Sequence, residues 1–368
     1  MRKGLLILIV AAFPLFVQAC QKNGSGDTTT RNNDAGQKVK YFKNPVIAGD
    51  HADPFVAQKD GNYYFLSTKG NNISIIKTRS MSQLAAAPET VVWSPPQNTD
   101  HSADIWAPEL HFISGKWYIY FAAAQSGVND SNRMFVIENE NADPTKGTWI
   151  FKGRLFDPAD DQWAIDGSIL TIGNKNYLVW SGWENATEKY KQYIYIAAMS
   201  TPWTLSGPRV KISSPTNEWE KWEPSSIGAG VNEGPIVLQR DANSPLFVIF
   251  SASRYSSDNY CLAQIQLKAG GNPLVAQDWI NKKQVFVRND NANVYGPGHN
   301  GFFTSSRKDD KGVLQTENWF IYHARNTPAM PNQPRTSRMQ KLNWNADGSP
   351  NFGIAVSTGT NIPIPIGD

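Results

Sequence analysis

The chain has 368 residues, of which 35 are Lys or Arg and 32 are Asp or Glu, so its formal net charge is only +3. This near balance, together with the lack of a long basic run, excludes an extended nucleic-acid-binding surface. The chain has two cysteines, Cys20 and Cys261, and the first lies in a leader segment, which excludes a disulfide framework. Cys261 lies in an apolar, strand-like run and is predicted to be a small buried side chain.

The first twenty residues have the order of an export signal. Two basic residues, Arg2 and Lys3, precede the apolar run Leu5–Val17, which is too short and too interrupted to indicate a membrane span. The segment ends in Val17-Gln18-Ala19-Cys20, which resembles a bacterial lipobox, so Cys20 is the predicted lipidation site. A cysteine placed by chance at the end of an ordinary signal is the alternative.

The next segment, residues 21–40, is polar and rich in Gly, Asn and Thr, without apolar periodicity. This composition is typical of a flexible tether. We therefore expect three parts: a signal peptide over residues 1–20, a tether over 21–40, and one folded domain over 41–368 that is large enough for a sizeable core.

A repeated plan fills the chain from about residue 44 onward. In the first copy Asp53 begins a short apolar strand, the turn Lys59–Asn62 reverses it, and the aromatic strand Tyr63–Leu66 returns. Four further copies follow, each with its own polar first residue, which we call the head. The five heads are Asp53, Glu109, Asp166, Glu233 and His299. Self-similarity of this kind indicates a repeat architecture.

Each aromatic strand is followed by another apolar or alternating run, so every unit contains three or four short antiparallel strands. Such units cannot bury both faces alone, and radial stacking around an axis protects their edges. The sequence therefore predicts an all-β fold, a five-bladed β-propeller. Because the first strand of each blade lines the central channel, we expect the five heads to converge at one mouth of it.

The converging heads indicate chemistry on sugars. Crowded carboxylates repel one another and raise the pKa of at least one of them, a cost that proteins keep mostly where function requires it. One protonated and one ionised carboxyl group on opposite sides of a sugar are what cleavage of a glycosidic bond requires. The 13 Trp, 13 Tyr and 17 Phe suit both strands and stacking on sugar rings. No serine nucleophile elbow, phosphate-binding glycine loop or clustered His and Cys spacing competes.

The motifs around the heads resemble those of glycoside hydrolase family 43, five-bladed propeller glycosidases that act on arabinans and xylans. The resemblance covers about Asn44 to Gly353. The matching motifs are Gly49–Pro54, Trp106–Glu109, Ile165–Ser168, Glu233–Pro235, Gly296–His299, Tyr322–Arg325 and the tail Arg338–Gly348. The first head lacks the Asn-Asp-Pro-Asn pattern of the related clan that retains anomeric configuration.

The resemblance implies roles for three carboxylates. Asp53 would be the general base, Glu233 the general acid, and Asp166 the third carboxylate, which orients the acid and raises its pKa. An Asp166 anion near Glu233 would hold the proton on that acid, as the physical chemistry of the pair requires. The family inverts the anomeric configuration, which needs base and acid roughly 6.5 to 9.5 Å apart to admit a water molecule.

Four other positions are candidates. Trp106 could form a wall of the sugar pocket, and Arg325 could contact sugar hydroxyls, although an ion pair within the last blade suits Arg325 almost equally. Glu109 is a candidate substrate-binding residue with no assigned chemical step, and it could instead hold Arg325 or a water. His299 matches a family histidine near a calcium ion on the channel axis, reached through water, with a purely structural role as the alternative. The chemistry itself requires no cofactor.

The resemblance of the NEGPIVL to SASRY segment and of the C-terminal tail predicts an α-L-arabinofuranosidase that removes terminal residues from arabinan or arabinoxylan oligosaccharides. Trp106, Trp163, Trp183 and Trp222 would close the channel mouth into a pocket for one terminal sugar. A β-xylosidase or an endo-1,5-α-L-arabinanase on the same scaffold is the alternative. A glycan-binding lipoprotein without catalysis is a more distant one, since it would lack one of the three carboxylates.

The expected setting follows from the leader segment and the predicted substrate. We expect a monomer in the bacterial cell envelope, periplasmic or anchored to the outer membrane, that touches the membrane only through its lipid. Its expected partner is a plant cell-wall oligosaccharide, and nucleic acid is not an expected partner.

Overall fold

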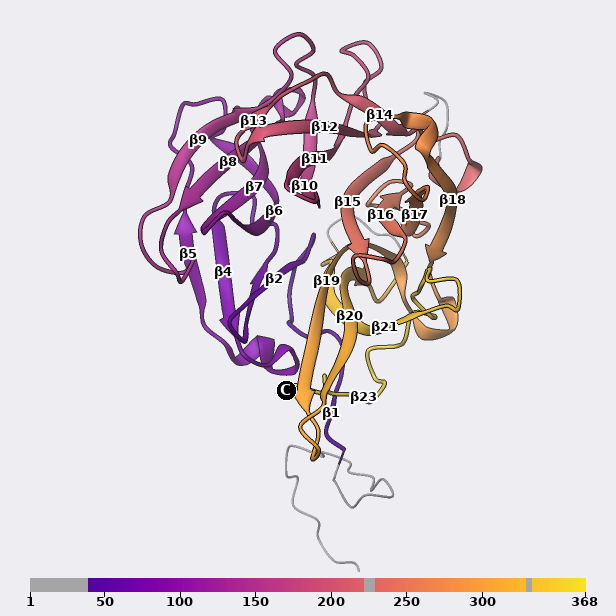
Figure 1. Ribbon diagram of the computed structural model, residues 1–368. Coiled ribbons are helices and arrows are strands. Elements are labelled where there is room, and N and C mark those ends of the chain that lie inside the picture. The colour runs from indigo at the N-terminus through magenta and orange to yellow at the C-terminus, as the bar shows by residue number, and fades with distance from the viewer. Residues whose placement is uncertain (1–38, 222–228, 329–332) are drawn as a thin grey trace, which may run out of the picture. The chain divides into compact units, whose positions relative to one another are not determined.

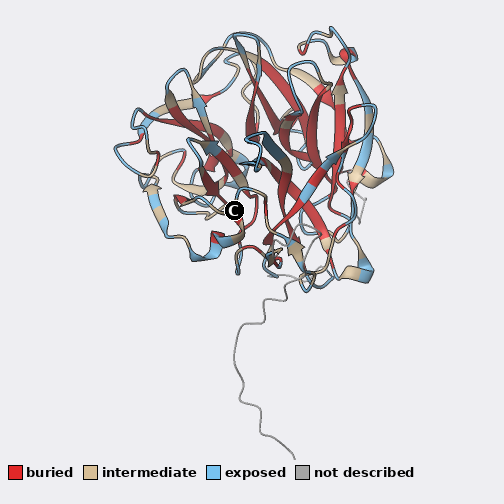
Figure 2. Cartoon of the chain, turned by 60° about the horizontal axis from the view of Figure 1, so that its bottom comes forward, coloured by how far each residue is buried: buried red, intermediate tan, exposed pale blue. Residues whose placement is uncertain are grey.

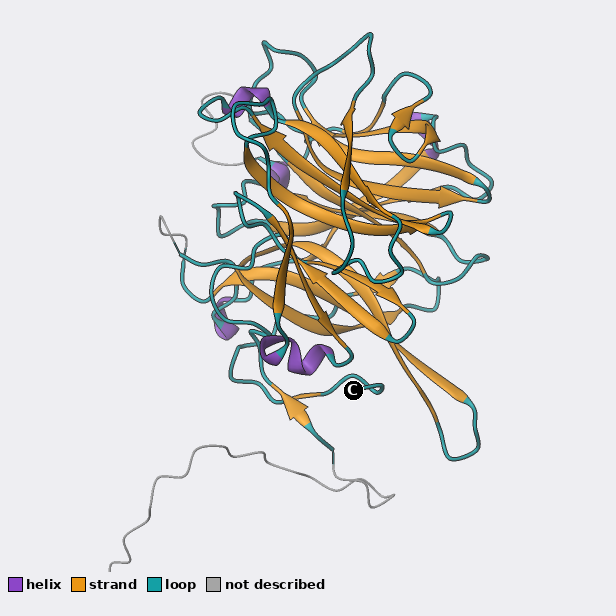
Figure 3. Cartoon of the chain, turned by 90° about the vertical axis from the view of Figure 1, so that its left-hand side faces the viewer, coloured by secondary structure: helices purple, strands orange, loops and turns teal. Residues whose placement is uncertain are grey.

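The computed structural model describes residues 39–221, 229–328 and 333–368, and Tyr41–Asp368 form one compact unit. Most of its regular structure is β-strand, and the few helices are short 3-10 turns (Figure 3). No helix within the described ranges is long and apolar enough to cross a membrane. The predicted lipidation site Cys20 and the predicted pocket residue Trp222 lie outside the described residues.

Five antiparallel sheets follow one another along the chain, each beginning with its innermost strand (Figure 1). The first two blades are β2 (Phe55–Lys59), β3 (Asn62–Leu66), β4 (Ile73–Thr78) and β5 (Glu89–Trp93), then β6 (Ala103–Ile113), β7 (Lys116–Ala124), β8 (Arg133–Asn139) and β9 (Ile150–Leu155). The third is β10 (Ala164–Ile172), β11 (Lys175–Gly182), β12 (Tyr193–Thr201), β13 (Thr204–Leu205) and β14 (Val210–Ser213). The last two are β15 (Asn232–Gln239), β16 (Leu246–Ala252), β17 (Cys261–Leu267) and β18 (Trp279–Phe286), then β19 (Tyr295–Lys308), β20 (Leu314–Arg325), β21 (Thr336–Trp344) and β22 (Pro350–Asn351). The described 3-10 helices are η1 (Met81–Ala86), η2 (Asn129–Ser131), η3 (Glu218–Glu220), η5 (Ala276–Asp278) and η6 (Asp290–Ala292).

The inner strands close a circle. β2 contacts β6, β6 contacts β10, β10 contacts β15, β15 contacts β19, and β19 returns to β2. This arrangement confirms the predicted all-β, five-bladed propeller.

Two of the hairpin turns follow directly from the local sequence. Lys59 pairs with Asn62 across Asp60-Gly61, and both turn residues have positive φ, 52° and 72°. Ile113 pairs with Lys116 in the same way across Ser114-Gly115, with φ of 49° and 89°. Two positive φ values define the type I′ turn, whose twist matches that of the strands it joins and whose second position glycine fills without strain.

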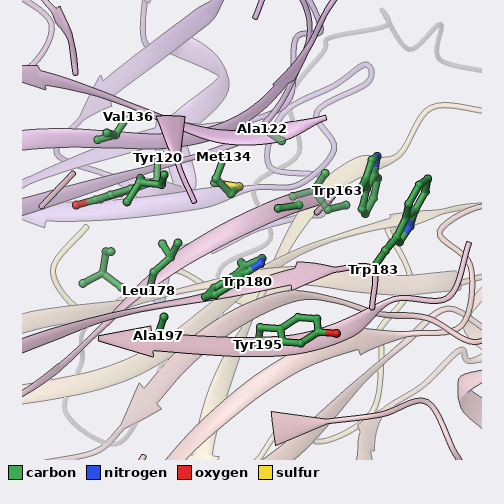
Figure 4. Packing of buried hydrophobic residues seen from close by; sticks show 14 of the residues in the cluster. Tyr120, Ala122, Met134, Val136, Trp163, Leu178, Trp180, Trp183, Tyr195 and Ala197 are labelled. Carbon is green, nitrogen blue, oxygen red and sulfur yellow. The ribbon is translucent and has the colours of Figure 1, made fainter. Parts of the chain in front are cut away.

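The core is divided among the interfaces between neighbouring blades. Figure 4 shows one of them, where side chains of the second blade pack against side chains of the third: Tyr120, Ala122, Met134 and Val136 against Leu178, Trp180, Tyr195 and Ala197. The other four interfaces each contain a comparable cluster. Buried residues accordingly follow the strands, and exposed residues follow the loops (Figure 2). Cys261 is 1% exposed in one of these clusters, as predicted.

The propeller closes where the first and last blades meet. β1 (Tyr41–Phe42) pairs with β23 (Ile362–Pro363), so the two ends of the domain share a small antiparallel sheet. Nearby, the buried Asn44 side chain donates to the Met339 carbonyl at 3.1 Å and accepts the Met339 N–H at 2.9 Å. These two hydrogen bonds pair the Asn44 side chain with the backbone of Met339 as a neighbouring strand would, and they hold the N-terminal segment against the fifth blade.

Candidate active site

A cavity of about 530 Å³ lies among the loops and inner strands, and all five blades contribute to its lining. The lining comprises three carboxylates, two arginines, one histidine, several aromatic side chains and a few smaller groups: Asp53, Thr68, Trp106, Asn129, Trp163, Ile165, Asp166, Trp183, Tyr190, Gln192, Val231, Glu233, Arg254, Tyr255, His299 and Arg335. The structure thus brings four of the five predicted heads together.

At the channel mouth every blade passes through a left-handed backbone conformation, with φ of 56° at Asp53, 44° at Ala107, 57° at Asp166, 56° at Gly234 and 45° at His299. In the last four blades the point coincides with an irregularity in the pairing of the two inner strands. Non-glycine residues rarely adopt this conformation, and such kinks are retained where they aim a side chain at a functional site.

This shared kink explains why Glu109 does not line the pocket. In the second blade the left-handed residue is Ala107, so Glu109 lies two residues further along β6. Glu109 is 3% exposed, and its Oε2 lies 2.9 Å from Nε2 of His111. Burial raises the pKa of Glu109, and the contact with His111 partly offsets that rise. Glu109 holds His111, not Arg325 as one prediction suggested.

Asp53 lies in the most cationic part of the pocket. Its Oδ2 accepts a hydrogen bond from Thr68 at 2.7 Å, and its Oδ1 lies 3.3 Å from Nη1 of Arg335 and 3.2 Å from Nδ1 of His299. Burial opposes ionisation, but Arg335, followed by His299 and His323, outweighs it and holds the pKa of Asp53 well below its usual range. Asp53 is therefore ionised throughout the neutral range.

Asp166 and Glu233 lie where burial dominates. Oδ2 of Asp166 accepts the Gly234 N–H at 2.9 Å, and Oε1 of Glu233 accepts the Tyr260 hydroxyl at 2.8 Å. Burial, followed by repulsion from Glu233 and Asp53, raises the pKa of Asp166 well above its usual range. Burial, only partly offset by the Tyr260 hydrogen bond, and then the charge of Asp53 raise the pKa of Glu233 to about 7. The pair therefore holds a proton near neutrality.

An aromatic wall borders the carboxylates. Trp106 belongs to the lining, as predicted, and the rings of Trp163 and Trp183 stack at 4.8 Å with an interplanar angle of 10°. Tyr190 meets Trp183 edge to face at 6.1 Å and is 54% exposed, so it forms the rim. Flat apolar faces beside polar groups suit a sugar ring.

Arg325, predicted to contact sugar, does not line the pocket. Its guanidinium donates to the carbonyls of Tyr255 at 3.0 Å and Ser257 at 2.8 Å, which leaves it 5% exposed behind the loop that carries Tyr255. Arg335 takes the position beside the carboxylate instead, and its guanidinium lies 5.0 Å from the Tyr255 ring. Sequence reasoning missed Arg335, for which the only signal was its place just before the matching tail Arg338–Gly348.

His299 lies in the pocket, but its surroundings offer few ligands for a metal. Within the described ranges, no group of three or more His, Cys, Asp and Glu side chains is arranged to hold a metal ion. Calcium prefers six to eight oxygen ligands, whereas among the described residues the ring of His299 pairs with one carboxylate, Asp53, which also binds Arg335. Direct coordination does not fit these residues, and the water-mediated calcium ion stays a prediction.

Comparison with known proteins shows which family and which relatives the chain is similar to. The family model described as Glycosyl hydrolases family 43 matches residues 42–350. An extracellular exo-α-(1→5)-L-arabinofuranosidase of Streptomyces avermitilis is 37% identical over 86% of this chain, and α-L-arabinofuranosidase 43 of Humicola insolens is 35% identical over 90%. The chain spans about two thirds of the length of these two relatives, 64% and 66%.

Among solved structures, an α-L-arabinofuranosidase from Lactobacillus brevis superposes with a TM-score of 0.75 and 33% identity, covering 87% of this chain and 98% of that one. Proteins named as endo-acting arabinan hydrolases share lower identity or cover less of the chain. With its five blades, its gathered carboxylates and a family match over most of its length, the chain belongs to glycosyl hydrolases family 43.

Proposed function

We propose that this protein is an exo-acting α-L-arabinofuranosidase, which removes terminal α-L-arabinofuranosyl residues from arabinan or arabinoxylan oligosaccharides with inversion. The observation that carries the proposal is the difference between two carboxyl groups in one pocket. The pKa of Asp53 is held low, whereas that of Glu233 is raised to about 7. An ionised base and a protonated acid are the two groups that glycosidic hydrolysis requires.

In the proposed reaction Asp53 accepts a proton from a water molecule as the water oxygen attacks the anomeric carbon. The bond between that carbon and the leaving oxygen breaks, and Glu233 donates its proton to the leaving oxygen. Asp166 and Glu233 repel each other's negative charge, which keeps a proton on the pair, while Oδ2 of Asp166 is fixed by the Gly234 N–H. The two-carboxylate mechanism needs no metal. Whether the protein binds the predicted calcium ion through His299 is tested by titration calorimetry, which compares calcium binding by the wild type and by His299→Ala.

Removal of a single terminal sugar is supported by the aromatic lining of the cavity. Its wall contains Trp106, Trp163 and Trp183, whereas an endo-acting enzyme needs an open cleft with subsites on both sides. The relatives with the highest identities quoted above are also named as arabinofuranosidases. A β-xylosidase or an endo-arabinanase stays the alternative on this scaffold, and a binding lipoprotein is disfavoured because all three carboxylates are present.

An NMR time course with residues 21–368 tests the proposal on arabinan, arabinoxylan and xylo-oligosaccharides. We expect monomeric arabinose from α-1,5-arabino-oligosaccharides, with the β-anomer appearing first. Xylose as the product would indicate a β-xylosidase, short oligomers an endo-arabinanase, and no product a binding protein. The α-anomer at early times would contradict inversion.

We also propose that the protein is exported and tethered by a lipid on Cys20, with residues 21–40 as the tether and the catalytic domain over 41–368. The similarity to Streptomyces proteins named extracellular supports export. Cys20→Ser should leave an exported protein that no longer extracts with membranes, because the lipid chain supplies about 0.8 kcal/mol per buried methylene. Membrane association that survives this substitution would contradict the anchor.

A further inference from the structure

Two buried rings lie face to face between the fourth and fifth blades. Tyr260 directly precedes β17 and His323 lies in β20, and their ring centroids are 5.6 Å apart with an interplanar angle of 5°. Tyr260 is 0% exposed and His323 is 1% exposed, and neither lines the pocket. A substrate in the pocket would therefore not touch them.

Each ring nevertheless holds one of the two carboxyl groups to which the proposed function assigns the acid and base steps. The Tyr260 hydroxyl donates to Oε1 of Glu233 at 2.8 Å. On the other ring, Nδ1 of His323 accepts the backbone N–H of Asp53 at 3.0 Å, at the residue whose φ is 56°. The stack thus connects the side chain of Glu233 in the fourth blade to the strained backbone of Asp53 in the first.

The protonation state of His323 follows from this contact. Because Nδ1 accepts the Asp53 N–H, its one proton lies on Nε2, and the ring is neutral. Burial lowers the pKa of His323 to about 4, which keeps the ring neutral throughout the working range. The approach of 3.4 Å between Nδ1 and Oδ1 of Asp53 is therefore not an ion pair, and the shorter contact of His323 with Asp53 is the one to its backbone N–H, at 3.0 Å.

Gly298 leaves the space that the Tyr260 ring occupies. A Cβ atom at position 298 would lie 2.2 Å from Cε1 and 2.4 Å from Cδ1 of Tyr260. Gly298 also pairs with His323 across the β19–β20 ladder, so the same glycine lies beside both rings. This gives a physical reason for the second glycine of Gly296-Pro297-Gly298-His299.

We propose that Tyr260 and His323 are positioning residues, a stacked pair that fixes the acid Glu233 and the base Asp53 relative to each other across three blades. The inference rests on the proposed function, since it assumes that these two carboxyl groups act together on one glycosidic bond. Tyr260 fixes the carboxyl group that gives a proton, and His323 fixes the backbone that aims the carboxylate that takes one.

Tyr260→Phe is the sharpest test, because it removes one hydroxyl and keeps the ring stacked on His323. A donor to a carboxylate favours the ionised form, so its loss should raise the pKa of Glu233, with Asp53, Asp166, Arg335 and Gln192 still facing it. We expect kcat to fall roughly 10- to 100-fold with little change in KM, and the alkaline limb of the pH profile to move up by about one unit.

Tyr322→Phe is the matched control. Tyr322 is also 0% exposed and donates one hydrogen bond, to Oε1 of Gln340 at 2.7 Å, but its partner is not a carboxylate of the pocket. It should lower the melting temperature about as much as Tyr260→Phe does and leave the pH profile where it was. Equal pH profiles for wild type and both variants would overturn the positioning role of Tyr260.

A second measurement separates this inference from the proposed function. The ¹³C carboxyl resonance of Glu233, assigned by its loss in Glu233→Gln, can be titrated by NMR without substrate. A higher pKa in Tyr260→Phe supports the contact even if the wild type releases no arabinose, in which case only the proposed function fails. An unchanged pKa refutes the contact even if arabinose is released.

His323 is tested through its conservative variant. Asn can place a polar atom near the position of Nδ1 and accept the Asp53 N–H, whereas Leu cannot. His323→Leu should lower kcat roughly tenfold or more, and His323→Asn should recover part of that loss at similar thermal stability. Equal losses in kcat for both variants would show that His323 only fills space.

Discussion

On one side of the pocket Asp53 faces a guanidinium, a histidine and a threonine hydroxyl, whereas on the other side Asp166 and Glu233 face each other, and Arg335 offsets only part of the rise in the pKa of Glu233. All three residues are buried, with exposed fractions of 9%, 4% and 7%. Burial alone would raise all three pKa values. The difference teaches that the neighbouring charges, not the depth of the site, separate a base from an acid here.

Asp53→Asn should give the largest loss, at least three to four orders of magnitude in kcat, because no other group in the lining is placed to accept the proton of the water. The loss should be the same for aryl arabinofuranosides with good and with poor leaving groups, since Asp53 does not act on the leaving oxygen. Steady-state kinetics on a leaving-group series measures both properties. If the loss in kcat becomes smaller as the leaving group improves, Asp53 is the acid and not the base, contrary to the assignment.

Glu233→Gln should lower kcat by roughly two to four orders of magnitude for natural substrates and keep sugar binding. In contrast to Asp53→Asn, the loss should become small for a dinitrophenyl leaving group, which departs without a proton. The same kinetic series provides the measurement. Turnover close to that of the wild type on oligosaccharides would remove Glu233 from the mechanism.

Arg335→Met should make the two sides of the pocket more alike. Without the guanidinium the pKa of Asp53 rises, so the base is protonated at higher pH and the acidic limb of kcat/KM moves up. Arg335→Lys keeps the charge and should keep most of the limb in place, which makes it the matched control. The measurement is the pH profile of kcat/KM between about pH 3 and pH 8 for the wild type and both variants. If the acidic limb of the Met variant lies at the same pH as that of the wild type, Arg335 does not set the charge of Asp53.

Asp166→Asn should give the smallest kinetic change and a gain in stability. Without the second carboxyl group, the proton that Asp166 and Glu233 hold together is lost from Glu233 at lower pH, so the alkaline limb of the pH profile moves to lower pH. Because a buried acid with a raised pKa destabilises the fold as pH rises through its ordinary value, the variant should melt at a higher temperature at pH 8. Calorimetry measures the melting temperature, and a pH profile of kcat locates the alkaline limb. If neither the melting temperature nor the alkaline limb changes, Asp166 has a structural role alone.

Local sequence predicted most of the architecture. The Asp60-Gly61 and Ser114-Gly115 turns fix hairpins through their own backbone preferences, and the repeated heads fix the number of blades. Glu109 was expected at the channel mouth but lies outside the lining of the cavity, because the left-handed residue of the second blade is Ala107. The sequence could not indicate this position, since an alanine side chain has no polar group.

The partners of the carboxylates were not predictable from local sequence. His323 is 270 residues from Asp53 and Arg335 is 282 residues from it, so only the closed ring brings them together. Tyr260 lies 27 residues from Glu233, in an apolar run that indicates a strand and nothing more. Contacts of this kind depend on how blades stack, which the pattern within one blade does not contain.

The seam between the first and last blades has a consequence for biosynthesis. Asp53 belongs to the first blade, but Arg335, His299 and His323 all come from the fifth, the last part of the domain to be synthesised. A nascent chain that already contains Asp53, Asp166 and Glu233 therefore still lacks the groups that keep its base ionised and aimed. Hydrolytic activity should first appear when the fifth blade docks, so it reports completion of the ring and not merely the presence of the three carboxylates.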